Sequence, residues 1–99
     1  MVNEKIRPGE LSSTTIATNV TAYKRNGIGM FVIWGVSITG GASGTTVCTI
    51  PEGFRPCDNV GFTTASTTIR GTIYPNGTVA VWNTGSTTNI YATVTYILA

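Results

Sequence analysis

The central part of the sequence decides the fold: residues 20–38 read VTAYKRNGIGMFVIWGVSI. β-Branched and aromatic residues, which favour strands, flank the dipeptide Asn26-Gly27. That dipeptide is the preferred pair of a two-residue type I′ hairpin turn, because both turn positions need a positive φ. Such a turn places Ala22 opposite Phe31, so the segment predicts two antiparallel strands.

The second of these strands, residues 28–38, is apolar on both faces. We expect its even-numbered side chains to point into the core, namely Ile28, Met30, Val32, Trp34, Val36 and Ile38. The odd-numbered Phe31 and Ile33 share the other face with Val20 and Ala22. A strand that is apolar on both faces is either covered twice within its own chain or covered once by a neighbouring subunit. We favour the second alternative and predict a subunit interface at Val20, Ala22, Phe31 and Ile33.

Composition extends the β prediction to the whole chain. Thr is the commonest of the 99 residues, with 19 copies, whereas Leu occurs only at positions 11 and 98. Turn signals follow one another at close spacing, which predicts an antiparallel β-sandwich of about seven or eight strands. We expect a connector or arm at residues 1–15 and a single sandwich domain at 16–99. Further strands are predicted at Thr45–Ile50, Val60–Ala65, Ile69–Tyr74, Thr78–Asn83 and Asn89–Leu98, with a crossing segment at 51–56.

Two of these strands form a second hairpin around Pro75-Asn76-Gly77. With a two-residue turn, Arg70 faces Asn83 and Gly71 faces Trp82. A glycine beside an aromatic residue suggests that the ring lies flat over exposed backbone. In the last strand, alternation predicts inward-facing side chains at Ile90, Ala92, Val94, Tyr96 and Leu98.

Charge excludes several functions. The chain has 6 basic and 4 acidic residues and no histidine. Lys24-Arg25 is the only adjacent basic pair, which argues against nucleic-acid binding. Without histidine the commonest general base and zinc ligand is missing, so we expect no metal, no cofactor and no enzymatic activity. Glu52 and Asp58 are candidates for a glycosidase pair, but both occupy ordinary turn positions.

Hydropathy and targeting signals are consistent with an assembled protein. A mean hydropathy of +0.20 with only 10% charged residues suggests that apolar surface is buried against another chain.

The N-terminus is polar and does not resemble a signal peptide. The longest apolar stretch, 28–38, is too short to span a bilayer, so we expect no membrane insertion. Without an export signal, Cys48 and Cys57 are interpreted as free thiols rather than as a disulfide.

One stretch resembles a known family. Residues 46–56 read TVCTIPEGFRP, which resembles the hydrophobic-Pro-Glu-Gly-aromatic-Arg-Pro element of phage tail-tip and baseplate proteins. In those proteins a hairpin and a terminal aromatic strand follow, and here GTIYPNGTV at 71–79 and YATVTY at 91–96 stand in the same order. The likeness covers about residues 20 to 99. It implies a trimeric β-sandwich at the end of a phage tail protein, located in the virion and made in the bacterial cytoplasm.

The resemblance implies one of two roles, a receptor-binding head that recognises cell-wall saccharide or a scaffold that holds another tail protein. Because such proteins usually carry a shaft or helical segment that this chain lacks, we expect it to be a C-terminal piece. Saccharide binding needs an aromatic platform with planar hydrogen-bonding groups around a shallow groove. The candidates are Trp82, Tyr74 and Tyr91, with Arg55, Arg70, Asp58, Asn83 and Asn89.

Alternatives remain open at the main candidates. Trp82 could instead pack in the core or at a subunit contact, and Arg55 could hold the crossing segment by bonding backbone carbonyls. Three functions therefore stand: a trimeric host-recognition domain that binds surface glycan, a structural baseplate module whose partner is another tail protein, and a free-standing carbohydrate-binding module unrelated to phage.

Overall fold

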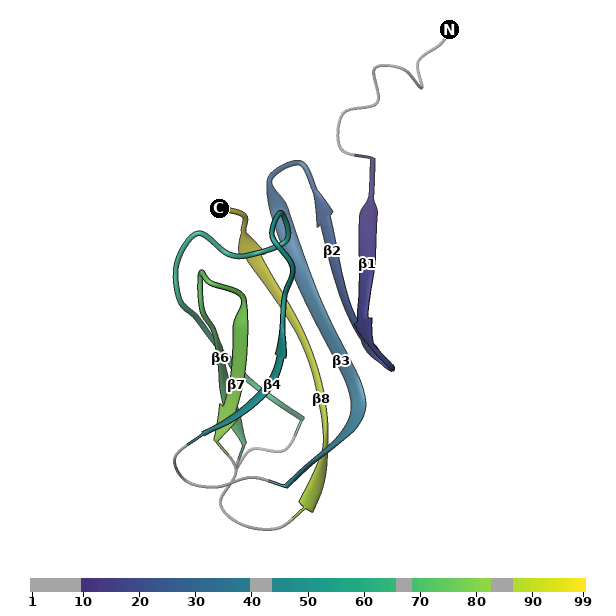
Figure 1. The fold of residues 1–99 in the computed structure, drawn as a ribbon, viewed down its shortest axis with the longest axis vertical. Coiled ribbons are helices and arrows are strands. Elements are labelled where there is room, and N and C mark those ends of the chain that lie inside the picture. Colours follow the sequence, from purple (N-terminus) through teal and green to yellow (C-terminus); the bar gives the residue numbers. More distant parts are fainter. Residues whose placement is uncertain (1–9, 40–43, 66–68, 83–86) are drawn as a thin grey trace, which may run out of the picture.

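The computed structural model describes residues 10–39, 44–65, 69–82 and 87–99, which form strands, turns and loops. Eight strands make two antiparallel sheets of four strands each, seen as two layers in Figure 1. The predicted all-β sandwich is therefore confirmed. The strands are β1 (Ser12–Ala17), β2 (Val20–Arg25), β3 (Ile28–Thr39), β4 (Thr45–Thr49), β5 (Val60–Thr63), β6 (Arg70–Ile73), β7 (Thr78–Trp82) and β8 (Thr87–Ile97).

The chain crosses between the sheets twice. The first sheet has the order β1-β2-β3-β8 and the second has the order β4-β7-β6-β5. Strand β8 thus returns beside β3, and these two strands pair along nearly their whole lengths (Figure 1). The outer edge of β8 is tied at two points, because the Cys57 N–H donates to the Ile97 carbonyl at 2.9 Å and the Ala65 N–H donates to the Tyr91 carbonyl at 3.0 Å.

The first hairpin has the predicted geometry. Asn26 and Gly27 have φ values of 54° and 79°, as a type I′ turn requires. Ala22 lies opposite Phe31, and the pairing continues to Val20 opposite Ile33. Strand β1, which adds to this hairpin, begins at Ser12, so residues 12–15 belong to the sheet and not to the predicted connector.

The predicted faces of β3 are wrong over most of the strand. Ile28 and Trp34 are 43% and 60% exposed, and the Met30 and Val32 side chains between them are only half-buried. Beyond Gly35 the prediction holds, because Ile38 is buried and Val36 packs against the core.

A β-bulge at Gly35 explains why the inward face changes along β3. The pairing with β8 shifts between Trp34 and Val36, and Gly35 has a φ of 74°. An extra residue in one strand inverts the alternation, since side chains alternate with a period of two. The even-numbered face is therefore outside before Gly35 and inside after it.

The predicted subunit interface is also wrong. Val20, Ala22, Phe31 and Ile33 are between 0% and 2% exposed in the single chain and belong to its core. They offer no surface to a neighbouring subunit. The same core contains the inner face of β8, where Ile90, Ala92, Val94 and Tyr96 are buried and Leu98 is half-buried, as predicted.

The second hairpin has a three-residue loop, Pro75-Asn76-Gly77, and not the two-residue turn under which Arg70 would face Asn83. The Tyr74 N–H donates to the Thr78 carbonyl at 2.9 Å, and the Gly77 N–H donates to the Tyr74 carbonyl at 2.8 Å. Gly77 has a φ of 93°, which is typical of three-residue hairpin loops that end on a left-handed residue. The extra loop residue shifts the register by one, so that Arg70 pairs with Trp82 and Gly71 pairs with Val81.

Candidate functional site

The register of the second hairpin brings two predicted site residues together. Arg70 on β6 and Trp82 on β7 are cross-strand partners, and such partners share one face of a sheet. Their neighbours Gly71 and Val81 are buried, so Arg70 and Trp82 lie on the outer face of the second sheet. The two-residue turn would have paired Arg70 with Asn83, a residue outside the described part of the chain.

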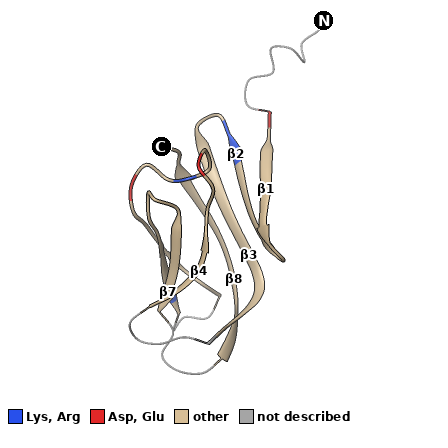
Figure 2. Cartoon of the chain, viewed as in Figure 1, with Lys and Arg blue, Asp and Glu red and all other residues tan. Residues whose placement is uncertain are grey.

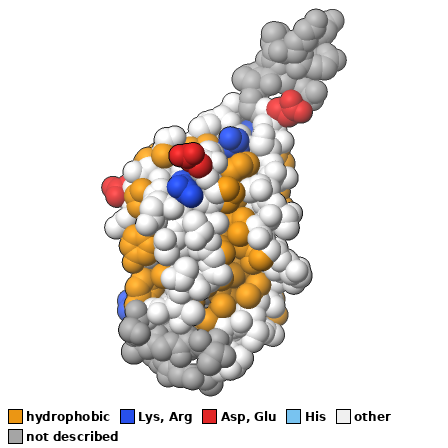
Figure 3. All heavy atoms as spheres, in the orientation of Figure 1, with side chains coloured by type: hydrophobic (Ala, Val, Ile, Leu, Met, Phe, Trp, Pro, Cys, Tyr) orange, Lys and Arg blue, Asp and Glu red, His pale blue; other side chains and the backbone are white. Residues whose placement is uncertain are grey.

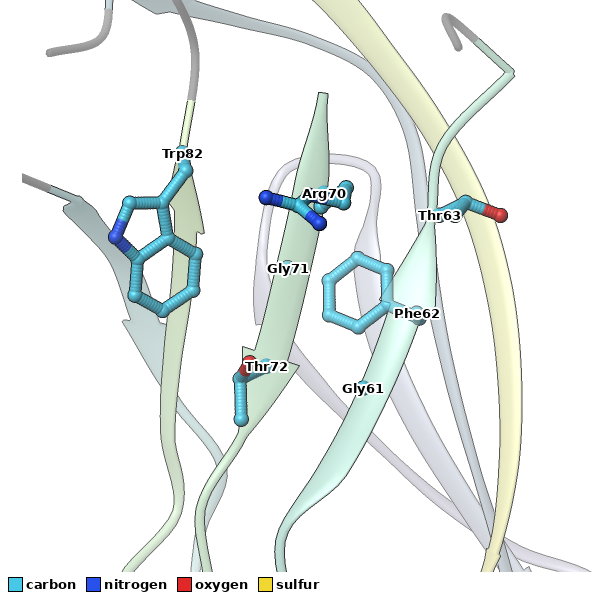
Figure 4. A pocket seen from close by; sticks show the side chains of 7 residues that line it. All are labelled: Gly61, Phe62, Thr63, Arg70, Gly71, Thr72 and Trp82. Carbon is cyan, nitrogen blue, oxygen red and sulfur yellow. The ribbon is translucent and has the colours of Figure 1, made fainter. Parts of the chain in front are cut away.

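A hollow of about 640 Å³ opens at these residues, and we call it the Trp82 hollow. Figure 4 shows the Arg70 guanidinium pointing from β6 toward Trp82, with Thr72 on the same strand. The hollow is lined by Gly61, Phe62, Thr63, Arg70, Gly71, Thr72 and Trp82. It combines an indole, a guanidinium and two hydroxyls, which are groups that bind saccharides in shallow sites.

Two glycines on β5 and β6 shape the hollow in different ways. A Cβ at Gly61 would meet no heavy atom within 4 Å, so the missing side chain leaves open space on the outer face. A Cβ at Gly71 would lie 2.2 Å from Cζ of Phe62. The Phe62 ring therefore occupies the space beside Gly71 (Figure 4) and packs against the core.

Trp82 itself lies beside a third glycine. A Cβ at Gly44 would come within 3.0 Å of the indole, and Gly44 has a φ of 94°. The indole is half-buried, so it is held against the backbone at the start of β4 and still borders the hollow. The predicted position of Trp82 beside Gly71 is wrong: Trp82 lies beside Gly44, and Phe62 lies beside Gly71.

The remaining predicted site residues lie elsewhere. Tyr74 follows Ile73 at the end of β6 opposite to Arg70. Tyr91 and Asn89 are on β8 in the other sheet, where Tyr91 packs edge-on against Trp34 with ring centroids 4.8 Å apart. Asp58 is exposed and accepts a hydrogen bond from the Asn59 N–H at 2.7 Å, as turn residues do.

Arg55 has a structural role. Its Nε donates to the Ile50 carbonyl at 2.7 Å, and the Ile50 N–H donates to the Gly77 carbonyl at 2.8 Å. Arg55 therefore ties the crossing segment 51–56 back to Ile50, which is itself bonded to the second hairpin, and this bond to a backbone carbonyl confirms the alternative interpretation of Arg55. The hydroxyl of Tyr96 holds the same segment by donating to the Phe54 carbonyl at 2.6 Å.

The two cysteines are free thiols, as interpreted from the sequence. Burial raises the pKa of Cys48 to about 11. Within the described ranges, no group of three or more histidines, cysteines and carboxylates is placed to hold a metal ion. The same ranges contain no helix of the length and hydropathy needed to cross a membrane.

A second surface feature was missed in the sequence. The outer face of the first sheet carries an apolar stripe along β3, formed by Ile28, Met30, Val32 and Trp34, with Ile97 of β8 beside it at 65% exposure. Near the hairpin end this face is hollowed by about 340 Å³ between residues that include Leu11, Tyr23 and Met30. The signal that could have revealed the stripe is Gly35, since a glycine inside a strand pattern often marks a bulge.

The chain matches no protein-family model, and no curated protein is significantly similar to it in sequence.

Proposed function

We propose that this chain is a host-recognition domain of a phage tail tip or baseplate, which binds cell-surface saccharide without chemical conversion. The observation that carries the proposal is the Trp82 hollow, where an indole, a guanidinium and two threonine hydroxyls border a space of about 640 Å³. The flat indole offers an apolar surface for the C–H face of a sugar ring, and the polar groups bond its substituents. The likeness of residues 46–56 to the tail-tip element supports the location in a virion.

We further propose that three copies pack through the outer face of the first sheet. The stripe exposes large apolar side chains. Arg25 precedes the turn that leads into β3, and from Ile28 to the end of that strand no side chain is charged. In a ring of three copies, one part of this face meets a different part of the same face on the next copy, and the uncharged stripe brings no like charges together there. The four strands cover a plane of roughly 550 Å² before side-chain relief is added, which is of the order of the 800 Å² or so that each partner buries in a stable interface.

Trimer formation would compensate for a weak single site. A shallow hollow on one chain gives low affinity, whereas three linked sites on one cell surface bind with an effective concentration that multiplies the affinity. This is the physical reason to expect a glycan-binding domain of 10.4 kDa to act as an oligomer.

The test of the saccharide site is a bacterial glycan array probed with labelled protein. Trp82→Ala should remove most of the bound signal, because the stacking surface is lost. Thr46→Ala is the matched control, since Thr46 is exposed on β4 and pairs with Ala80 on the same sheet. Equal binding by wild type and Trp82→Ala would contradict the proposed site.

The second candidate function is a scaffold that attaches another tail protein, and the observation that favours it is the same apolar stripe. Light scattering after size exclusion separates the possibilities. A trimer of the 10.4 kDa chain has a mass of about 31 kDa, and Trp34→Lys should reduce it to the monomer. If the wild-type protein is a monomer and binds glycan, the result favours a free-standing carbohydrate-binding module. If it binds a tail protein and no glycan, the result favours the scaffold function.

A further inference from the structure

The charges of the molecule are separated along its length. The acidic residues that the structure describes, red in Figure 2, all lie toward the end of the molecule that holds the C-terminus. Arg70 begins β6 and pairs with Trp82, the last residue of β7, and β7 ends at the opposite end of the molecule (Figure 1). In Figure 3, most of the charged side chains on this side of the molecule lie in its upper part, at the end that holds the C-terminus. Hydrophobic side chains lie on the surface between β4 and β3. Arg70 thus stands far from any described carboxylate that could neutralise it.

The sequence adds no compensating charge near β6 and β7. The segments that adjoin Arg70 and Trp82 in the chain, 66–68 and 83–86, read STT and NTGS, and the segment 40–43 before Gly44 reads GGAS. None contains an acidic or basic residue. Among the described residues that line the Trp82 hollow, Arg70 is the charged one, so a ligand there responds to its positive charge.

The groups around the hollow also favour one kind of ligand. The guanidinium offers five N–H donors and no acceptor, while Thr63 and Thr72 offer hydroxyls. Carboxylate acceptors, which match the hydroxyl donors of a neutral sugar, are absent from the lining. A planar guanidinium instead matches the two oxygens of a carboxylate or phosphate, and such paired bonds are about twice as strong as neutral ones.

We propose that the Trp82 hollow selects saccharides that carry a negative charge, with the sugar ring against Trp82 and its carboxylate or phosphate at Arg70. This inference rests on the proposed saccharide-binding function and narrows it to one ligand class. Gly61, opposite Thr72 on the same face as Arg70 and Thr63, contributes by leaving open space for the rest of the ligand.

The experiment is an NMR titration of the full chain that follows the indole N–H of Trp82. Three probes are compared: trigalacturonate, which carries carboxylates, a short oligomer of glycerol phosphate, and neutral maltotriose. We expect binding of at least one anionic probe that is about tenfold or more tighter than that of maltotriose. Adding salt to about 0.15 M should weaken the anionic complex and leave a neutral one unchanged.

Three variants test the assignment of residues. Arg70→Gln should weaken the anionic probe by about tenfold or more, and Arg70→Lys should retain part of the affinity, because it keeps the charge but loses the planar fork. Gly61→Leu should block all binding by filling the hollow. Arg25→Gln is the control, since it removes the same charge from an exposed residue at the end of β2, in the other sheet.

The outcomes separate this inference from the function on which it rests. If maltotriose binds as tightly as the anionic probes, and is blocked by Gly61→Leu but unaffected by Arg70→Gln, charge selection is overturned while saccharide binding stands. If none of the probes shifts the Trp82 resonance and the glycan array gives no signal, both proposals fail. Preference between trigalacturonate and glycerol phosphate identifies the source of the charge.

Discussion

The two outer faces of the sandwich each present a tryptophan, and the surroundings of the two rings differ. Trp34 is 60% exposed on the first sheet and contacts Tyr91 edge-on at 4.8 Å. Trp82 is half-buried on the second sheet, lies against Gly44 and borders a hollow beside Arg70. Of the two rings, the less exposed one borders the hollow that we propose as a ligand site.

The difference comes from glycine and charge. On the first sheet Gly35 creates a bulge that turns an apolar row outward, so the result is a flat stripe suited to another protein surface. On the second sheet Gly61 leaves a gap opposite Thr72, on the face that also carries the Arg70 guanidinium, so the result is a hollow that we propose as a ligand site. Gly35 reverses which side chains of β3 face outward, whereas Gly61 leaves open space on the second sheet because it has no side chain.

The largest expected effect distinguishes the inner and outer faces of β3. Phe31→Ala should lower the free energy of unfolding by about 3–5 kcal/mol, because the buried ring leaves a cavity. Trp34→Ala should lower it by only about 1 kcal/mol, mainly through the lost contact with Tyr91. Urea unfolding at matched protein concentration measures both, and Phe31→Leu serves as a milder core variant if Phe31→Ala does not fold. A larger loss for Trp34→Ala would restore the original assignment of the two faces.

An intermediate effect distinguishes the two glycines beside the hollow. Gly71→Val should destabilise the fold by about 1–3 kcal/mol, because its side chain overlaps the Phe62 ring and the core must shift. Gly61→Val should be neutral or stabilise the fold by up to about 1 kcal/mol, since valine favours strands and meets open space. Thermal unfolding of the two variants gives the comparison. Equal destabilisation would mean that Gly61 is also enclosed by side chains.

Local patterns predicted much of the fold. The Asn26-Gly27 turn fixed the register of β2 and β3, and alternation identified the buried face of β8. The faces of β3 could not be chosen by alternation, because both are apolar and the bulge inverts them. Pairing β3 with β8 would have resolved the choice, since Phe31 lies opposite Val94, which was already predicted to face inward.

The candidate site was predicted in part. Trp82 and Arg70 were named from residue type alone, but their pairing depends on whether the second loop has two residues or three, and Asn-Gly occurs in both kinds. Residues that line the hollow without a distinctive side chain, such as Gly61 and Thr72, carry no local signal. They become recognisable only when β5 is placed beside β6.

The smallest expected effect compares two tyrosines on opposite faces of β8. Burial raises the pKa of Tyr96 from 10.0 to about 12, and its neutral hydroxyl donates to the Phe54 carbonyl at 2.6 Å. The unfolded chain loses this proton near pH 10 and the folded chain keeps it until about pH 12, so rising pH across this window favours unfolding. The stabilising contribution is complete below pH 10 and is lost as the pH approaches 12.

Tyr96→Phe isolates this contribution. The variant should lose about 1 kcal/mol of stability at neutral pH, through the missing hydrogen bond to Phe54. Its free energy of unfolding should then depend less on pH between about 10 and 12 than that of wild type, since the titrating group is gone. Tyr91→Phe, which removes a tyrosine hydroxyl from the outer face of the same strand, is the control variant measured beside it. If Tyr96→Phe unfolds with an unchanged pH dependence, the Tyr96 hydroxyl does not hold the crossing segment, and the inner face of β8 is less enclosed than its burial indicates.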